Sequence, residues 1–229
     1  MKSLVFDAGP IISLASNNLL WLLRPLKKEF NGKFYITHYV KKEIVDRPLE
    51  IKRFKFEAIQ VQKLIDEGVL EIIDNSLIRE ESIKLLNTSN EIFKAYNNYM
   101  KIVHLAEISV ITAALNLNSD VAVIDEKTTR LLIENPRMIF EILRKTLHTP
   151  VSINESNLKE FKNRVRGIKV IRSVELAAIA YEHGLLDEYI TKISDAKRSL
   201  LESVLWGVKL NGCAVSREEI DNILAMEAK

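Results

Sequence analysis

Five acidic side chains stand where an α/β protein often carries its chemistry. Asp7 and Asp125 each directly follow a short apolar run, and Glu126 comes immediately after Asp125. Glu43 lies about one turn into the helix expected after a third apolar run, and Glu107 opens a strongly apolar helical segment. Because ligands of open parallel sheets bind beyond the carboxyl ends of the strands, we expect several of these acids to converge.

Converging carboxylates repel one another, and each raises the pKa of its neighbours. A hard divalent cation removes that repulsion, and Mg²⁺ and Mn²⁺ prefer carboxylate and water oxygens. Such a cation can activate a water against a phosphodiester and offset charge on the leaving oxygen. The alternative interpretation is structural. An acid after a strand is more often a turn former or a helix cap, and Glu126 would be an acid in the first turn of a helix, where the helix dipole favours a negative charge.

Short apolar runs alternate with amphipathic helical segments along the whole chain, which is typical of a parallel sheet covered on both faces. The prediction is a three-layer α/β/α fold with a central, mostly parallel sheet of about five strands, followed by a C-terminal helical extension. The division is expected at 1–186 and 187–229, with the extension packed on the same domain. The expected strands cover residues 4–6, 34–36, 69–73, 121–124 and 168–171, and the segments 76–100 and 185–210 are expected to be mainly helical.

Composition limits the classes of protein that fit. Apolar residues make up 47% of the 229, enough to build a core and to exclude a disordered chain. Cys213 is the only cysteine, which excludes an intramolecular disulfide and a thiolate metal cluster. No apolar stretch reaches the roughly 20 residues of a membrane span, so a cytoplasmic protein without a membrane partner is expected.

Four segments carry these acids in a consistent order. They are FDAGPIISLA at 6–15, ITHYVKKEI at 36–44, LAEISVITAA at 105–114 and VIDEKTTR at 123–130. Together they resemble the four motifs of the PIN domain, a family of metal-dependent ribonucleases, in the family's order. The segment 167–186 resembles the last strand and helix of an archaeal and bacterial PIN subgroup, so the likeness extends over roughly 4–186. Ala106 departs from the family, where relatives often have glycine before the third acid.

The resemblance implies a Mg²⁺ or Mn²⁺ site and an endoribonuclease that cuts RNA. The four acids of the motifs would be catalytic and hold the ion, and Glu126 would compete with Asp125 for the fourth place. Two hydroxyls would orient carboxylates or water, although for Ser13 the alternative is a helix residue with no such role. In order, these residues are Asp7, Glu43, Glu107, Asp125, Glu126, Ser13 and Ser109.

Charge is distributed unevenly, although the net charge is only +2. Ten Lys/Arg face five acids over 20–60, and eight face two acids over 144–172, whereas 61–93 has three against seven. The basic segments are either RNA contacts or solvated helix faces. Trp21 and Trp206 lie in apolar contexts and are expected to pack rather than to stack on bases.

Two cellular settings fit the resemblance: the toxin of a toxin–antitoxin pair, blocked by a small antitoxin protein, and an RNA-processing factor. A homodimer is expected if the C-terminal apolar helix leaves a face uncovered. The alternative from another class is a nucleic-acid-binding or scaffold module with this fold and little catalysis. A response-receiver type of regulator fits less well, because the first apolar run is followed by one acid, Asp7, rather than by a pair.

Overall fold

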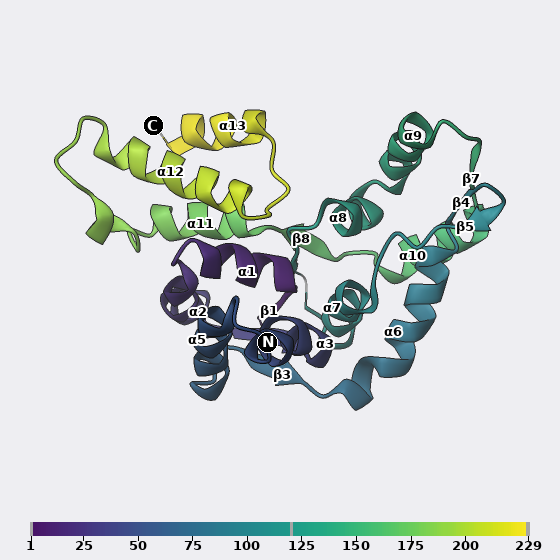
Figure 1. Cartoon of the computed structure of the whole chain (residues 1–229), viewed down its shortest axis with the longest axis horizontal. Coiled ribbons are helices and arrows are strands. Elements are labelled where there is room, and N and C mark those ends of the chain that lie inside the picture. The colour runs from purple at the N-terminus through teal and green to yellow at the C-terminus, as the bar shows by residue number, and fades with distance from the viewer. Residues whose placement is uncertain (1, 120, 228–229) are drawn as a thin grey trace.

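The computed structural model of the chain describes residues 2–119 and 121–227. A five-stranded parallel sheet runs through its centre in the order β3-β2-β1-β6-β8, with helices on both faces (Figure 1). The predicted three-layer α/β/α fold is therefore confirmed. The strands are β1 (Ser3–Phe6), β2 (Lys33–Thr37), β3 (Glu71–Ile73), β6 (Val121–Val123) and β8 (Lys169–Ile171).

The strand order reverses next to the central strand β1. From β1 the chain proceeds to β2 and β3 on one side, and it returns to β6 and β8 on the other. Phe6 is the register partner of Val123, and the Asp7 amide continues the pairing by donating to the Val123 carbonyl at 2.9 Å. The carboxyl ends of β1 and β6 thus lie side by side at the point of reversal, which is where open α/β sheets bind their ligands.

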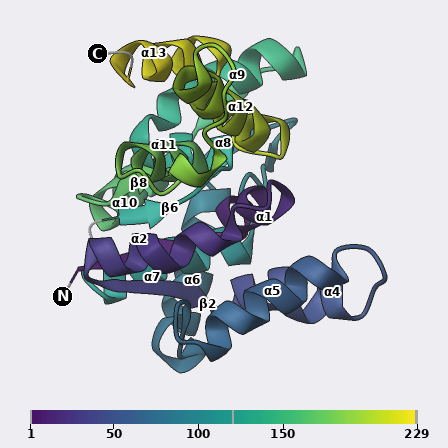
Figure 2. The same cartoon turned by 90° about the vertical axis from the view of Figure 1, so that its left-hand side faces the viewer.

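Different helices cover the two faces of the sheet. The helices α1 (Ala8–Ser16), α11 (Ser173–Glu182) and α12 (Ala196–Leu210) pack against one another on one side. On the other side, α7 (Leu105–Asn116) contacts β1, β2 and β6, and α3 (His38–Lys41) and α6 (Asn75–Asn90) pack against it. Figure 2 shows α4 (Arg47–Leu49) and α5 (Lys55–Asp66) at the opposite end of the molecule from α12 and α13 (Arg217–Glu227).

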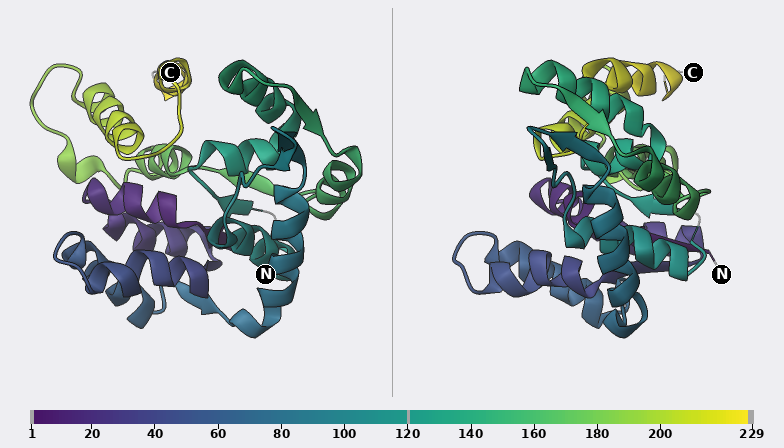
Figure 3. Two further views of the ribbon diagram at one scale, coloured as in Figure 1. Left: turned by 45° about the vertical axis from the view of Figure 1, so that its right-hand side comes forward. Right: turned by 90° about the vertical axis from the view of Figure 1, so that its right-hand side faces the viewer.

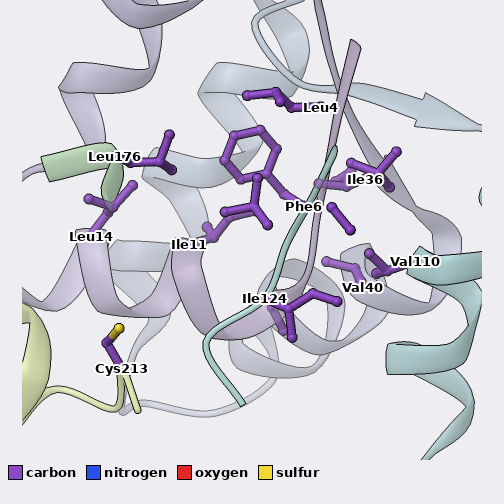
Figure 4. Packing of buried hydrophobic residues seen from close by; sticks show 14 of the residues in the cluster. Leu4, Phe6, Ile11, Leu14, Ile36, Val40, Val110, Ile124, Leu176 and Cys213 are labelled. Atoms are coloured by element: carbon purple, nitrogen blue, oxygen red, sulfur yellow. The ribbon is translucent and has the colours of Figure 1, made fainter. Parts of the chain in front are cut away.

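The apolar core holds β1 rigidly in place. Leu4 and Phe6 point to the same face of the strand, where Phe6 lies beside Ile11 of α1 and Leu14 follows farther along that helix, while Val110 of α7 lies on the other side (Figure 4). All five side chains are buried, and full burial of such a side chain is worth about 1.5–3 kcal/mol. The strand end that carries Asp7 is therefore fixed by packing on both faces.

Local signals account for several helix boundaries. Thr37 caps α3 by accepting from the Val40 amide at 3.2 Å. Asn18, with φ of 56°, separates α1 from the helical stretch that follows. The remaining helices are η1 (Leu20–Leu22), α2 (Leu23–Phe30), η2 (Lys42–Asp46), α8 (Lys127–Glu134), α9 (Pro136–Leu147), α10 (Glu155–Arg164) and η3 (Asp187–Tyr189).

A small second sheet corrects the helical prediction for 76–100. The helix α6 ends at Asn90, and an antiparallel sheet of order β5-β4-β7 follows, made of β4 (Phe93–Ala95), β5 (Asn98–Tyr99) and β7 (Val151–Ile153). A helix cannot continue there because Tyr96 and Asn97 have φ of 47° and 64°. Figure 3 shows this sheet with α6 and α10 on one side of the molecule, away from α12 and α13.

The helical segment expected over 185–210 is interrupted in the structure. Only η3 and α12 are helical there, and Asp195, with φ of 52°, stands immediately before the first residue of α12. Within the part of the chain that the structure describes, no helix is both long and apolar enough to cross a membrane.

Candidate active site

A cavity of about 590 Å³ opens at the carboxyl edge of the sheet, where β1 and β6 end. Four acids contribute to its lining: Asp7, Glu43, Glu107 and Glu126. They come from four different segments, namely the ends of β1 and β6, the short π-helical turn η2 and the first turn of α7. Among the described residues, none of the four forms an ion pair with Lys, Arg or His.

Asp7 is the most deeply placed of these acids. It stands at the N-terminal boundary of α1 with an extended backbone, and it is only 4% exposed. The pKa of Asp7 is raised to about 7, mainly by burial and also by the charges of Glu107, Glu43 and Asp125, against a lowering by the Ala8 amide. An ionised Asp7 is thus costly in this environment unless a cation is brought to it.

Glu107 and Glu126 both lie at the N-terminal ends of helices and line the cavity. Glu107 lies in the first turn of α7 and accepts from the His104 amide at 2.7 Å, and Glu126 accepts from the Thr129 amide at the start of α8. Burial raises the pKa of Glu107, and the charges of Glu126 and Glu43 raise it as well. The structural reading of Glu126 as a helix cap is therefore correct, but one carboxylate can both cap a helix and border the cavity.

The rim beside Glu43 carries the opposite charge. Lys42 and Arg47 flank Glu43 on η2 and at the start of α4, and both line the cavity together with Tyr39 and His104. Lys42 and Arg47 are exposed. Cations at the rim and carboxylates in the floor form an arrangement that can take a phosphate group at the mouth and a metal ion below it.

Asp125 lies behind the cavity wall and not on it. Its side chain is 1% exposed, and its oxygens accept from the Ser173 amide at 2.7 Å, the Ser173 hydroxyl at 2.6 Å and the Ser13 hydroxyl at 2.8 Å. The backbone carbonyl of Asp125 accepts from the Ala214 amide at 3.2 Å. Three donors therefore already bind this carboxylate, whereas Glu126 next to it reaches the cavity.

The two hydroxyls singled out by sequence act on different neighbours. Ser13 donates to Asp125, so it orients a carboxylate. Ser109 is hydrogen-bonded to Thr37 at 2.7 Å and donates to the Ala106 carbonyl, which ties the end of β2 to α7. Ser109 thus helps to place the helix that carries Glu107.

Glycine is required where α1 begins. A Cβ on Gly9 would lie 3.2 Å from the Asp125 Cβ and 3.9 Å from Oδ2 of Asp7. The absence of a side chain lets the first turn of α1 approach both carboxylates closely.

The possible metal ligands here are carboxylate oxygens, which a hard divalent cation prefers. Burial and the charges of neighbouring carboxylates raise the pKa of both Asp7 and Glu107. The acids are nevertheless spread around the cavity: within the described ranges, no three His, Cys, Asp or Glu side chains come close enough together to hold a metal ion. The described residues therefore supply the ligand type of a metal site, but they do not bring three such ligands close together.

Sequence reasoning missed Ser173, whereas Lys42 and Arg47 belong to the basic segment 20–60, which it considers for RNA contacts without singling them out. Ser173 is 48 positions from Asp125, and nothing local to either residue signals the pairing. Lys42 and Arg47 could have been found, because they stand one residue before and four residues after Glu43 and so share its helical neighbourhood.

Comparison with known protein families gives a match. The family model described as "DUF3368: PIN domain" matches residues 3–136, which is more than half of the chain and includes all five predicted site acids. No curated protein and no solved structure matches the chain significantly.

Proposed function

Because the chain belongs to the PIN-domain family, whose members are generally nucleases, we propose that it is a divalent-metal-dependent endoribonuclease that hydrolyses RNA phosphodiester bonds. The observation that carries the proposal is the cavity whose lining includes Asp7, Glu43, Glu107 and Glu126, none of which forms an ion pair with a basic side chain among the described residues. A protein with no use for a cation would be more stable with these carboxylates dispersed.

PIN domains typically use divalent metals, and Asp7, Glu43, Glu107 and Glu126 would hold Mg²⁺ or Mn²⁺. When bound, the metal would supply a nucleophile at neutral pH and charge stabilisation at the phosphorus. Asp125 would support this site from behind, because its three hydrogen bonds fix the end of β6 and with it the start of α8. The sequence-based alternative, with Asp125 itself as the fourth ligand, predicts instead that Asp125→Asn loses metal binding and that Glu126→Gln keeps it.

Lys42 and Arg47 would bind the phosphates on either side of the scissile bond, because both cations project at the mouth of the cavity. Tyr39 would contact a base or ribose at the same rim. These roles place the RNA backbone across the cavity mouth, with the scissile phosphate above Asp7.

The decisive experiment measures cleavage of a labelled single-stranded RNA by the purified protein with Mn²⁺ and with EDTA. We expect cutting only with the metal, and we expect Asp7→Asn and Glu107→Gln each to abolish it. The matched control is Glu202→Gln, which changes an exposed acid on α12 and should cut like the wild type. Undiminished cleavage by the Asp7→Asn, Glu107→Gln double variant would show that the nuclease site is elsewhere.

A second function, RNA binding with little catalysis, is favoured by the spread of the carboxylates around the cavity. Calorimetric titration with Mn²⁺ separates the two functions. Saturable binding that is lost in Asp7→Asn supports the nuclease, whereas RNA binding without any Mn²⁺ binding at millimolar concentration supports the binding module.

The cellular role remains a proposal in two forms, a toxin held by a small antitoxin protein and an RNA-processing factor. A short open reading frame that overlaps or adjoins this one would indicate the first. Sedimentation of the purified chain tests the expected homodimer.

A further inference from the structure

The small sheet that sequence analysis missed carries an exposed aromatic and basic surface. Residues 92–104 contain two lysines and no acid, and residues 142–154 contain an arginine and a lysine and no acid. The structure brings these two segments together, because β4 pairs with β7. We define the hairpin surface as Lys94, Tyr96, Tyr99, Arg144 and Lys145.

Strand alternation aims part of this surface outward. Lys94 is the register partner of Tyr99 on β5 and of Ser152 on β7, so the three side chains share one face of the sheet. Phe93 and Ala95 point to the opposite face and are buried. Tyr99 is 50% exposed, and the Lys94 ammonium lies 5.8 Å from its ring centroid.

Tyr96 occupies a position that tyrosine does not favour. Tyr96 and Asn97 connect the paired residues Ala95 and Asn98, and both have positive φ, as in a type I′ hairpin turn. Such turns strongly prefer Asn or Gly, and an aromatic residue with φ of 47° is strained. The strain does not serve burial, since Tyr96 is 68% exposed, and its hydroxyl donates to the Leu147 carbonyl at 3.2 Å. A strained and exposed side chain indicates function more than stability.

The end of α9 adds cations beside the hairpin. Its residues Arg144 and Lys145 are exposed, and the Arg144 guanidinium lies 5.4 Å from the centroid of the Phe140 ring and 3.6 Å from the carboxylate of Glu141, an exposed ion pair that a phosphate would have to compete with. The bond from Tyr96 to Leu147 joins this helix end to the hairpin turn. Aromatic rings interleaved with Lys and Arg are the usual platform for single-stranded nucleic acid, because bases stack on the rings while cations follow the phosphates.

We propose that the hairpin surface binds single-stranded RNA beside the cavity, an inference that rests on the proposed nuclease function. Tyr96 and Tyr99 stack on unpaired bases, and Lys94, Arg144 and Lys145 contact phosphates. Duplex RNA is disfavoured, because its base faces are hidden in the helix stack.

The hairpin surface lies within reach of the cavity along the chain. Five residues lead from Tyr99 to His104, which lines the cavity, and an extended segment of that length spans at most about 18 Å. An RNA whose bases stack on the hairpin surface would therefore reach the catalytic acids within a few nucleotides of the stacked bases. The surface would set how far from a bound single-stranded segment the RNA is cut.

The test measures the binding of a fluorescein-labelled single-stranded RNA by anisotropy in EDTA, where no metal-dependent cleavage occurs. We expect Tyr99→Ala to weaken binding at least about fivefold, as loss of one stacked base requires. Tyr96→Asn is the sharper variant: it should weaken binding by a similar factor and yet leave the melting temperature unchanged or raised, since Asn suits the turn. If Tyr96 had a purely structural role, Tyr96→Asn would lower the melting temperature and leave RNA binding by the folded protein unchanged.

The matched aromatic control is Tyr189→Ala, because Tyr189 is 48% exposed but lies on η3, outside this surface. The double variant Lys94→Gln, Lys145→Gln should reduce the salt dependence of binding by a slope of about 0.7 for each phosphate that the protein no longer neutralises. Duplex RNA should bind more weakly than the single strand and should be insensitive to Tyr99→Ala.

The outcomes separate this proposal from the nuclease proposal. If the wild type shows no Mn²⁺-dependent cleavage but the hairpin variants lose RNA affinity, the surface is supported and the nuclease is not. If the wild type cuts RNA and both tyrosine variants bind RNA like Tyr189→Ala, the hairpin proposal is wrong and the nuclease stands. In the latter case the surface would be left for a protein partner.

Discussion

Replacing Asp7 by Asn should stabilise the metal-free protein while abolishing its activity. The pKa of the buried Asp7 is about 7, against 3.8 for the ordinary carboxyl. The shift of about three pKa units corresponds to about 4 kcal/mol by which the ionised group destabilises the fold, as an upper bound that relaxation of the site reduces. In a chain of this length 1 kcal/mol changes the melting temperature by about 2–4 °C, so the variant should melt on the order of 10 °C higher.

The sign of the effect follows from proton binding. Between the unfolded and the folded pKa the native protein holds a proton on Asp7 that the unfolded chain has lost, so native stability falls as the pH rises from 3.8 towards 7. The gain from Asp7→Asn should therefore be small near pH 4 and complete above about pH 7.

Thermal melting in EDTA across this pH range measures the effect, with Glu43→Gln as the matched acid-to-amide control. Glu43 lines the same cavity but is exposed, so its variant should melt close to the wild type. Adding Mn²⁺ should raise the melting temperature of the wild type and not that of Asp7→Asn, because only a folded protein with an intact site binds the ion. The reasoning is refuted if Asp7→Asn is destabilised in EDTA above about pH 7, or if its difference from the wild type does not depend on pH.

Three further predictions concern neighbouring groups. Asp125→Asn should lower the free energy of unfolding in urea by about 1–3 kcal/mol, because it disturbs buried hydrogen bonds. The same variant should keep the Mn²⁺-induced rise in melting temperature, whereas Glu126→Gln should lose that rise. The reverse pattern would make Asp125 the ligand. Arg47→Ala should weaken RNA binding in EDTA and lower its salt slope by about 0.7, and an unchanged slope would remove Arg47 from the phosphate path. Ser109→Ala should cost about 1 kcal/mol of stability by urea titration, through its bond with Thr37, and a neutral effect would show that this bond is not stabilising.

The central sheet could be predicted because its signals are local. Its strands are short segments rich in apolar residues, and the fully apolar runs 4–6 and 121–124 are followed at once by an acid and by a helical segment. Once the strands are parallel, their carboxyl ends share an edge, so the neighbourhood of Asp7 and Asp125 follows without knowledge of side-chain contacts. The five-stranded parallel sheet confirms that part of the reasoning.

The small sheet could not be predicted by the same rules. Its hairpin turns on Tyr96 and Asn97 without the glycine that usually marks a two-residue turn, and β5 is only two residues long. Strand β7 completes it from a segment more than 50 residues away along the chain, within a stretch that reads as a loop because of Pro150. Pairing between such distant segments depends on tertiary packing, which periodicity does not record.

The choice between Asp125 and Glu126 also depends on distant residues. Either acid could face the cavity from the end of β6, and the decision is made by Ser173 at the start of α11, whose amide and hydroxyl both donate to Asp125. The first turn of a helix has free amides, so a buried carboxylate there is well satisfied and has little reason to turn outward. With Asp125 bound in this way, Glu126 is the residue left to face the cavity.

This arrangement makes the C-terminal region part of the support of the site. Ser173 and Ala214, which contact Asp125, both lie beyond residue 136, where the family match ends. Arg172 strengthens the same junction, since its guanidinium donates to the Ala214 carbonyl at 3.0 Å and to Glu219 at 2.8 Å. A fragment that ended at residue 136 would leave the Asp125 carboxylate with only Ser13 as a donor, and burying a charge without its hydrogen bonds is costly. The end of β6, and with it Glu126, therefore takes its position from helices that the matched part of the chain does not contain.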